Sequence, residues 1–123
     1  MKFSEFRAGQ VIEAGPCGVS DAERLQFTNT YDPPWLHTDA AAAAQGRFGG
    51  IIASGWHAWG IAMRLTTDAA LHGSESLTSL GLAYLKGIHP VRAGDALSPR
   101  GFSAACRPRG PRCRWPARPG RLR

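Results

Sequence analysis

The pattern of apolar and polar positions predicts short strands and helices gathered around one long apolar helix. Residues 3–14 carry spaced apolar side chains, which predicts a leading segment and a first short strand. Residues 20–23 read Ser-Asp-Ala-Glu, a capping box whose serine and glutamate satisfy early backbone N–H groups. A helix is therefore expected over about residues 21–28.

A run of five alanines predicts a second, shorter helix over residues 40–45, because alanine has the highest helix propensity. Thr38 or Asp39 can cap its beginning, and Gly46 ends it. The following Gly49-Gly50 pair is interpreted as a turn. It lacks both the G-x-x-x-x-G-K-[ST] and the G-x-G-x-x-G frames of phosphate-binding loops.

The longest predicted helix runs from Gly55 to about Leu71, with Ser54 as its N-cap. Arg64 and Asp68, four residues apart, form its one polar stripe. A helix that is apolar almost all round is expected to be buried. Its tryptophans are accordingly interpreted as core or dimer-interface residues before ligand-stacking ones. The apolar positions are Trp56, Ala58, Trp59, Ile61, Ala62, Met63, Leu65 and Ala69.

The pattern changes near the C-terminus. Residues 80–88 (LGLAYLKGI) alternate enough to predict a strand, whereas residues 98–123 are rich in arginine and contain five prolines. Because proline cannot donate a hydrogen bond within a sheet, this tail is not expected to supply central strands. The chain is therefore divided into a folded part, residues 1–97, and a tail, residues 98–123, expected to be disordered.

Asp32 and His37 are the acid and imidazole pair most suited to chemistry. At a spacing of five they would lie on nearly opposite sides of a helix and on opposite faces of a strand, so only a turned loop can aim both at one point. Pro33 and Pro34 supply such a loop, because each keeps the residue before it out of the helical region. A paired carboxylate and imidazole can divide acid and base work. The alternative is that Asp32 caps a turn and His37 packs beneath it.

The residues around this pair resemble the MaoC-like dehydratases and (R)-specific enoyl-CoA hydratases, a branch of the hot-dog fold. D-x-x-x-L-H-x-D is followed by an alanine-rich stretch and by R-F-G-G-I-I-A-S-G-W. HPVRAGDAL also resembles the family's P-V-x-x-G-D turn, and the similarity extends over about residues 6–95. Pro33-Pro34 replaces an Asn-Pro or Gln-Pro, and Met63 replaces a serine of some hydratases. The matching positions are Asp32, Leu36, His37, Asp39, Phe48, Ile51 and Gly55.

The resemblance implies an α+β hot-dog fold, an antiparallel sheet wrapped around a central helix. It is expected to be incomplete, because the C-terminal strands are missing or replaced. The implied activity is that of a lyase, the hydration or dehydration of 2-enoyl or 3-hydroxyacyl thioesters of coenzyme A or an acyl carrier. No metal or other cofactor is called for, since coenzyme A enters with the substrate. A homodimer is expected.

The same resemblance assigns roles to four residues. Asp32 and His37 would be catalytic, holding and activating the water that adds to the double bond. The Gly55 N–H, at the positive end of a helix dipole, would polarise the thioester carbonyl as part of an oxyanion hole. Ser54 beside it is the second candidate for this oxyanion and substrate-binding position.

Charge is unevenly divided along the chain. Residues 1–97 hold seven Lys or Arg and nine Asp or Glu, whereas residues 98–123 hold eight Arg and no acid. The net charge of +6 therefore belongs to the tail. One hypothesis is that a GC-rich gene is read out of frame beyond about residue 97. The competing one is a basic arm for nucleic acid, which is the less expected partner because an arm does not account for the missing strands.

Length and composition exclude several classes. The 123 residues fit a single domain. No apolar run approaches the about 18 residues of a membrane span, and the N-terminus lacks the apolar core of a signal peptide, so a cytoplasmic protein without membrane contact is expected. Three cysteines without C-x-x-C spacing predict neither a disulfide framework nor a zinc site.

Two other functions remain open. Thioester hydrolysis is another hot-dog chemistry and would release a free thiol. A truncated, non-catalytic remnant or binding module would keep the motif without a working groove. Because half a sheet cannot cover a tryptophan-rich helix, the chain by itself is expected to be marginally stable and to expose apolar surface.

Overall fold

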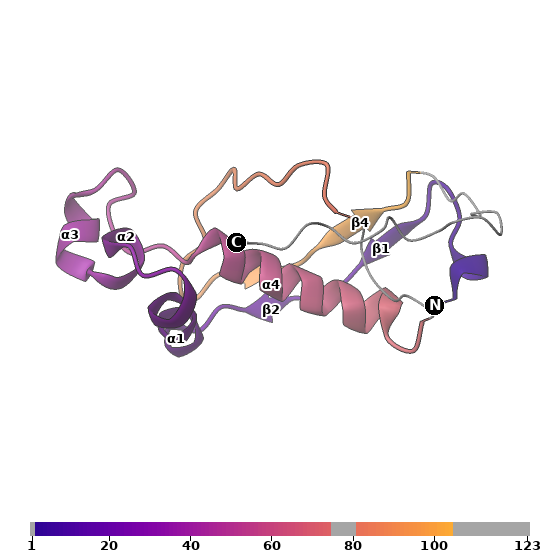
Figure 1. Ribbon diagram of the computed structural model, residues 1–123, viewed down its shortest axis with the longest axis horizontal. Coiled ribbons are helices and arrows are strands. Elements are labelled where there is room, and N and C mark those ends of the chain that lie inside the picture. Colours follow the sequence, from indigo (N-terminus) through magenta and orange to yellow (C-terminus); the bar gives the residue numbers. More distant parts are fainter. Residues whose placement is uncertain (1, 75–80, 105–123) are drawn as a thin grey trace, which may run out of the picture.

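A long helix lies along a narrow antiparallel ribbon in the computed structural model, which describes residues 2–74 and 81–104 (Figure 1). The chain begins with a short 3-10 helix, η1 (Phe3–Glu5), and a first short strand follows it, as the sequence predicted. The strands of the ribbon are β1 (Val11–Glu13), β2 (Cys17–Gly18), β3 (Ala96–Leu97) and β4 (Arg100–Phe102).

The ribbon consists of two antiparallel ladders. β1 pairs with β4, placing Val11 opposite Phe102, and β2 pairs with β3, placing Cys17 opposite Leu97. Between the two ladders, residues 14–16 lie opposite residues 98–99. The extra residue on one side is the arrangement of a β-bulge. Gly15 lies there with a φ of 93°, and a Cβ at this position would come 2.7 Å from the Leu97 carbonyl oxygen. This position therefore requires glycine.

Strand β4 lies within the tail, residues 98–123, which was expected to be disordered and to supply no central strands. Residues 100–102 pair with β1, because Pro99 lies just outside the strand, where its missing N–H is not needed. The carbonyl of Pro99 still accepts a hydrogen bond from the Ala14 N–H at 3.2 Å. The domain boundary at residue 97 stays a prediction, and residues 105–123 lie outside the described residues.

Three helices form a cluster at one end of the molecule (Figure 1). Ser20 caps the first of them by accepting from the Glu23 N–H at 3.2 Å, which confirms the serine half of the capping box. The Glu23 carboxylate accepts from the Ser20 hydroxyl at 2.8 Å. Asp39 caps the third through the N–H groups of Ala41 and Ala42, as predicted. The helices are α1 (Asp21–Tyr31), α2 (Trp35–Thr38) and α3 (Ala40–Gln45).

The central helix, α4 (Gly55–Thr66), begins where the sequence predicted. The Ser54 hydroxyl caps it by accepting from the Trp56 N–H at 3.2 Å, and Arg64 pairs with Asp68 at 2.7 Å. The expected helix to residue 71 changes its hydrogen bonding after Thr66 and continues as a π-helix, η2 (Thr67–Leu71). The helical segment therefore ends as predicted, although its last turn is wider.

The expectation that α4 would be buried is wrong for the described chain. None of its residues is buried, and the side chains of Trp56 and Met63 are 67% and 58% exposed. The reason is that the described strands are few and short, so they cover only part of the helix. The core is instead small, and the prediction of exposed apolar surface is confirmed. The buried apolar residues are Val19, Ala43, Ile52, Ala53 and Ala70.

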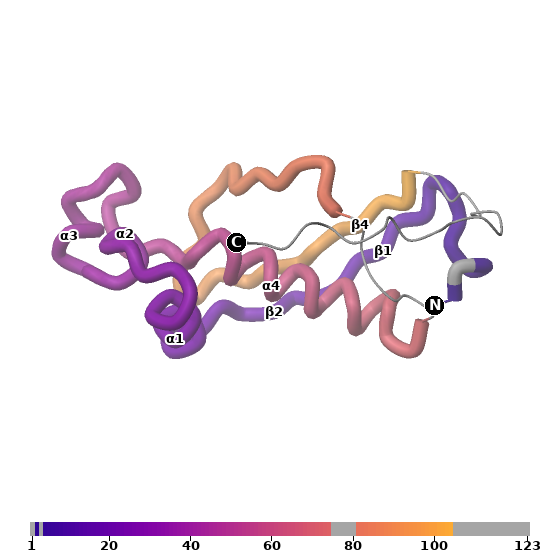
Figure 2. The backbone as a smooth tube through the Cα atoms, in the orientation of Figure 1, coloured from indigo at the N-terminus to yellow at the C-terminus, as the bar shows by residue number. Residues whose placement is uncertain are grey.

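The strand predicted over residues 80–88 is also wrong where the structure describes it. Residues 81–88 form no regular strand and run as an open segment beside α4, drawn in orange in Figure 2. Leu82 and Tyr84 are 73% and 78% exposed. Alternation alone does not make a strand when no neighbouring strand of the described residues pairs with it.

The predicted turn at Gly94 and Asp95 is present. The Arg92 N–H donates to the Asp95 carboxylate at 2.8 Å, and Gly94 adopts a φ of 92°. The Gly94 N–H then donates to the Val19 carbonyl at 2.9 Å, which joins the turn to the residue directly after β2. The turn therefore directs the chain from α4 back into the sheet.

Candidate functional site

His37 lies in α2, directly after the two prolines, and only 7% of it is exposed. Its Nδ1 lies 2.8 Å from the Ile52 carbonyl oxygen. Because a carbonyl only accepts hydrogen bonds, this contact places a proton on Nδ1 and leaves the lone pair of the neutral ring on Nε2. The ring is thus fixed in both position and tautomer.

Asp32 reaches the other side of this ring. It is the C-cap of α1, and its N–H donates to the Thr28 carbonyl at 3.0 Å. Its carboxylate oxygen lies 3.5 Å from His37 Nε2, and its side chain is 27% exposed. A water molecule placed about 2.8 Å from both atoms would contact the acid and the imidazole together. The proline loop therefore brings the two side chains together, while the backbone N–H of Asp32 ends α1.

Gly55 is the first residue of α4, and a Cβ built on it would meet nothing within 4 Å. The N–H groups at a helix start have no acceptor within the helix and carry the positive end of its dipole. Ser54 is completely buried, and its hydroxyl accepts from the Trp56 N–H. The backbone at Gly55 is therefore open to a ligand, whereas the Ser54 hydroxyl is occupied as a cap.

His37 and Gly55 line the same cavity, which has a volume of about 380 Å³. Its walls come from α2, from the segment between α3 and α4, from the start of α4 and from residues 86–91. Asp32 lies outside this lining and contacts the His37 ring. Most of the walls are apolar, so the cavity suits a hydrocarbon chain better than a charged group. The apolar lining includes Phe48, Ile52, Ala53, Trp59, Ile88 and Val91.

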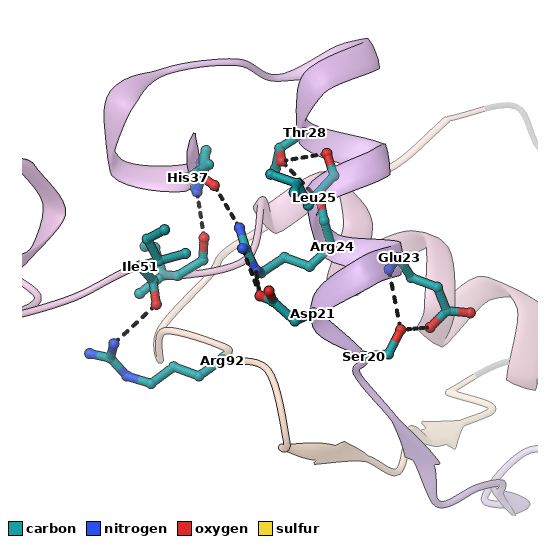
Figure 3. Close-up of polar contacts among 10 residues, drawn as sticks. Ser20, Asp21, Glu23, Arg24, Leu25, Thr28, His37, Ile51 and Arg92 are labelled. Carbon is teal, nitrogen blue, oxygen red and sulfur yellow. Dashed lines mark hydrogen bonds and ion pairs between the residues drawn. The ribbon is translucent and has the colours of Figure 1, made fainter. Parts of the chain in front are cut away.

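Arg24 is a site residue that the sequence did not reveal. It is 3% exposed, and one of its terminal nitrogens donates to the His37 carbonyl at 2.6 Å. Its remaining donors contact the Asp21 carboxylate at 2.8 and 2.7 Å (Figure 3). The i,i+3 spacing from Asp21 indicates an ion pair, but no local pattern indicates a contact with the backbone of His37.

Arg92 was missed for the same reason. Its guanidinium donates to the Ile51 carbonyl at 3.1 Å (Figure 3). It also donates to the Phe48 carbonyl. The neighbouring residue, Ile52, accepts from the His37 ring. Arg92 therefore braces the segment that holds the imidazole, through carbonyl groups that every residue possesses.

His57 is distinct from this site. Its ring stacks on Phe27 with centroids 5.0 Å apart, and its Nδ1 is buried without a partner among the described residues. Burial lowers the pKa of His57 below its usual 6.5, the charge of Arg24 lowers it further, and Glu23 raises it. The ring lies outside the cavity that His37 lines.

Two kinds of feature are absent from the part of the chain that the structure describes. There, no three His, Cys, Asp or Glu side chains gather in a way that would hold a metal ion. No helix of that part is long and apolar enough to cross a membrane.

The chain has a helix against antiparallel strands, with an acid and an imidazole near the amino end of that helix. This arrangement is an incomplete hot-dog fold of the dehydratase type. The family model described as MaoC like domain matches residues 5–107. The chain belongs to this family, which confirms the resemblance drawn from the Asp32 and His37 motif. The match extends past residue 97, into the part of the chain that contains β4.

Individual proteins are similar to this chain over most of its length. The uncharacterized protein YdeM of Bacillus subtilis (strain 168) is 33% identical over 97 residues, which are 79% of this chain and 69% of YdeM. The crystal structure of a MaoC-like dehydratase from Rhodospirillum rubrum is 30% identical, with a TM-score of 0.64 over 79% of this chain and 66% of that one.

The R-hydratase PhaJ1 from Pseudomonas aeruginosa, in its unliganded form, is 25% identical with a TM-score of 0.56. The similarity covers 80% of this chain and 61% of PhaJ1. The chain thus spans somewhat less than two thirds of these two solved relatives.

Proposed function

We propose that this chain catalyses the hydration of 2-enoyl thioesters and the reverse dehydration of 3-hydroxyacyl thioesters, carried on coenzyme A or an acyl carrier. The observation that carries the proposal is that His37 and Gly55 line one apolar cavity, with Asp32 3.5 Å from the His37 ring. Membership of the MaoC-like family and the similarity to a protein named R-hydratase support it.

The proposed reaction uses the tautomer that the Ile52 carbonyl favours. A water molecule held by Asp32 and His37 loses a proton to Nε2 as its oxygen adds to the β-carbon of the enoyl thioester. The resulting imidazolium is stabilised by the Asp32 carboxylate and then gives a proton to the α-carbon. The Gly55 N–H stabilises the negative charge that develops on the thioester oxygen in between. The same steps in reverse expel water.

The test is the hydration of trans-2-butenoyl-CoA, measured as the decrease in absorbance of the enoyl thioester. Asp32→Asn and His37→Ala should each lower kcat about 100-fold or more, because each removes part of the acid and base machinery. Asp39→Asn is the matched control. It changes a carboxylate two residues from His37 to another good helix cap, and its activity should remain close to that of the wild type.

Two outcomes would contradict the proposal. Release of free coenzyme A without loss of the double bond would assign thioester hydrolysis. The absence of any hydratase activity that depends on both Asp32 and His37 would indicate a non-catalytic remnant.

We also propose that the chain acts as a homodimer. The exposed apolar side chains of α4, including Trp56 and Met63, support this because a second copy would remove them from water. Such a contact would lie on the helix whose first residue, Gly55, lines the cavity.

A further inference from the structure

We propose that Arg24 is a positioning residue that fixes the orientation of His37 toward Asp32, an inference that rests on the proposed hydratase function. Arg24 is almost completely buried, and its guanidinium contacts only two partners that the structure describes, the His37 carbonyl and the Asp21 carboxylate. It does not line the cavity, so it acts on the substrate through another residue.

The contact with Arg24 supplies a hydrogen-bond donor to the C-terminal end of α2. This helix is a single turn, and the last carbonyl groups of a helix accept no hydrogen bond from within it. Arg24 donates to one of these carbonyls at 2.6 Å, while the Ile52 carbonyl holds the ring at Nδ1. The His37 backbone is therefore held at its carbonyl by Arg24, in addition to the hydrogen bond from its N–H to the Pro34 carbonyl at 2.9 Å. The Ile52 carbonyl holds the ring at Nδ1, and Nε2 is left facing Asp32.

Helix α1 holds both Arg24, which contacts His37, and the C-terminal end to which Asp32 is attached. The Thr28 hydroxyl donates to the Arg24 carbonyl at 2.9 Å, and the Thr28 carbonyl accepts from the Asp32 N–H at 3.0 Å. Asp32 is thus attached to the end of α1, and His37 is attached to the same helix through Arg24. The guanidinium sets the distance between the two members of the pair.

A buried guanidinium is costly unless it is paired, so an apolar side chain would serve better if packing were the only requirement. The charge of Arg24 is paired with Asp21, whose side chain is 70% exposed. One planar guanidinium can contact the Asp21 carboxylate and the His37 carbonyl at once, which a lysine ammonium cannot do in the same fixed geometry.

The test compares Arg24→Met and Arg24→Lys with Arg64→Met as a control. Arg64 is also an ion-paired arginine, but it is 77% exposed and lies outside the cavity lined by His37. In the hydration of trans-2-butenoyl-CoA, Arg24→Met should lower kcat about 10-fold to 100-fold, because a small misplacement of a reacting group has an effect of this size. KM should change less than about 3-fold, because Arg24 does not touch the substrate. Arg24→Lys should recover part of kcat, and Arg64→Met should behave as the wild type.

A second readout does not depend on activity. Long-range ¹⁵N–¹H correlation of the His37 ring should show the Nδ1–H tautomer in the wild type and a mixture of tautomers in Arg24→Met. If Arg24→Met does not fold, Arg24→Lys provides the same comparison with the charge retained.

A third readout is the pH dependence of kcat, which should shift in the Arg24 variants and not in the Arg64→Met control.

A folded Arg24 variant with wild-type kcat, pH dependence and ring spectrum would overturn this proposal. If the wild type proves to have no hydratase activity, the proposed function fails while the ring spectrum still reports whether Arg24 orients His37. The two failures are therefore distinguishable.

Discussion

Two histidines of this chain differ in what surrounds their rings. His37 has a carbonyl at one nitrogen and a carboxylate near the other, both suited to holding a proton in a defined place. His57 has an aromatic ring against its face and an Nδ1 without a partner among the described residues. The first environment is suited to proton transfer, whereas the second only makes protonation unfavourable.

This contrast predicts how stability depends on pH. Because burial lowers the pKa of His57, the unfolded chain takes up a proton near pH 6.5 and the folded chain does so only at lower pH. The free energy of unfolding should therefore decrease as the pH falls from 6.5 toward the lower folded pKa, and be unaffected by His57 above that range.

His57→Gln should reduce the loss of Tm between about pH 7.5 and about pH 5.5, because glutamine does not titrate. Thermal melts of both proteins at the two pH values measure this difference. Equal losses of Tm in the two proteins would show that His57 is protonated as readily in the folded chain as in the unfolded one.

The candidate pair could be predicted from sequence, whereas its supports could not. The spacing of Asp32 and His37 and the two prolines between them require a bent loop, and the structure has one. Arg24 and Arg92 act on backbone carbonyls, which all residues share, so sequence carries no signal for these contacts. The catalytic role of the pair remains a prediction.

At the scale of elements, the beginnings of helices could be predicted from their N-cap residues, whereas strand pairing could not. Ser20, Asp39 and Ser54 each accept the helix N–H groups that local sequence predicts, so the beginnings of α1, α3 and α4 were correct. A strand needs a partner that can lie far away in sequence. The partner of β1 is β4, about 90 residues later, and the segment over residues 81–88 has none among the described strands.

The caps of α1 and α4 offer a matched pair of variants. Ser20→Ala and Ser54→Ala should each lower the free energy of unfolding by about 1 kcal/mol, because each leaves a helix N–H without its acceptor. Only Ser54→Ala should also lower kcat for enoyl-CoA hydration, because the Gly55 N–H lies at the start of the helix that Ser54 caps.

Denaturant unfolding gives the stability changes, and initial hydration rates give kcat. If both variants lost activity in proportion to their stability, the beginning of α4 would have no special part in the reaction.

At the scale of the whole molecule, the described chain has more apolar surface than its strands cover. α4 was expected to be buried from its composition, yet composition cannot say how many strands will surround a helix. The small core and the exposed Trp56 and Met63 side chains are the physical consequence. The tendency to aggregate that follows from such a surface remains a prediction.

The exposed face of α4 predicts that association depends on Trp56. Trp56→Lys should convert a dimer into a monomer in sedimentation velocity experiments, because it places a charge where apolar surface would be covered. Tyr31→Lys is the control, since Tyr31 is 74% exposed but belongs to α1. A wild-type chain that sediments as a monomer, or a Trp56→Lys variant that remains a dimer, would contradict this use of the face.

The central claim is that Asp32 and His37 act as one unit on a bound thioester, and a double-mutant cycle in the hydration of trans-2-butenoyl-CoA tests it most directly. If the two side chains share one water molecule, Asp32→Asn combined with His37→Ala should lower kcat little further than the more damaging single substitution. Losses of kcat that multiply in the double variant would show that the two side chains act independently, and the account of a paired site would then be wrong.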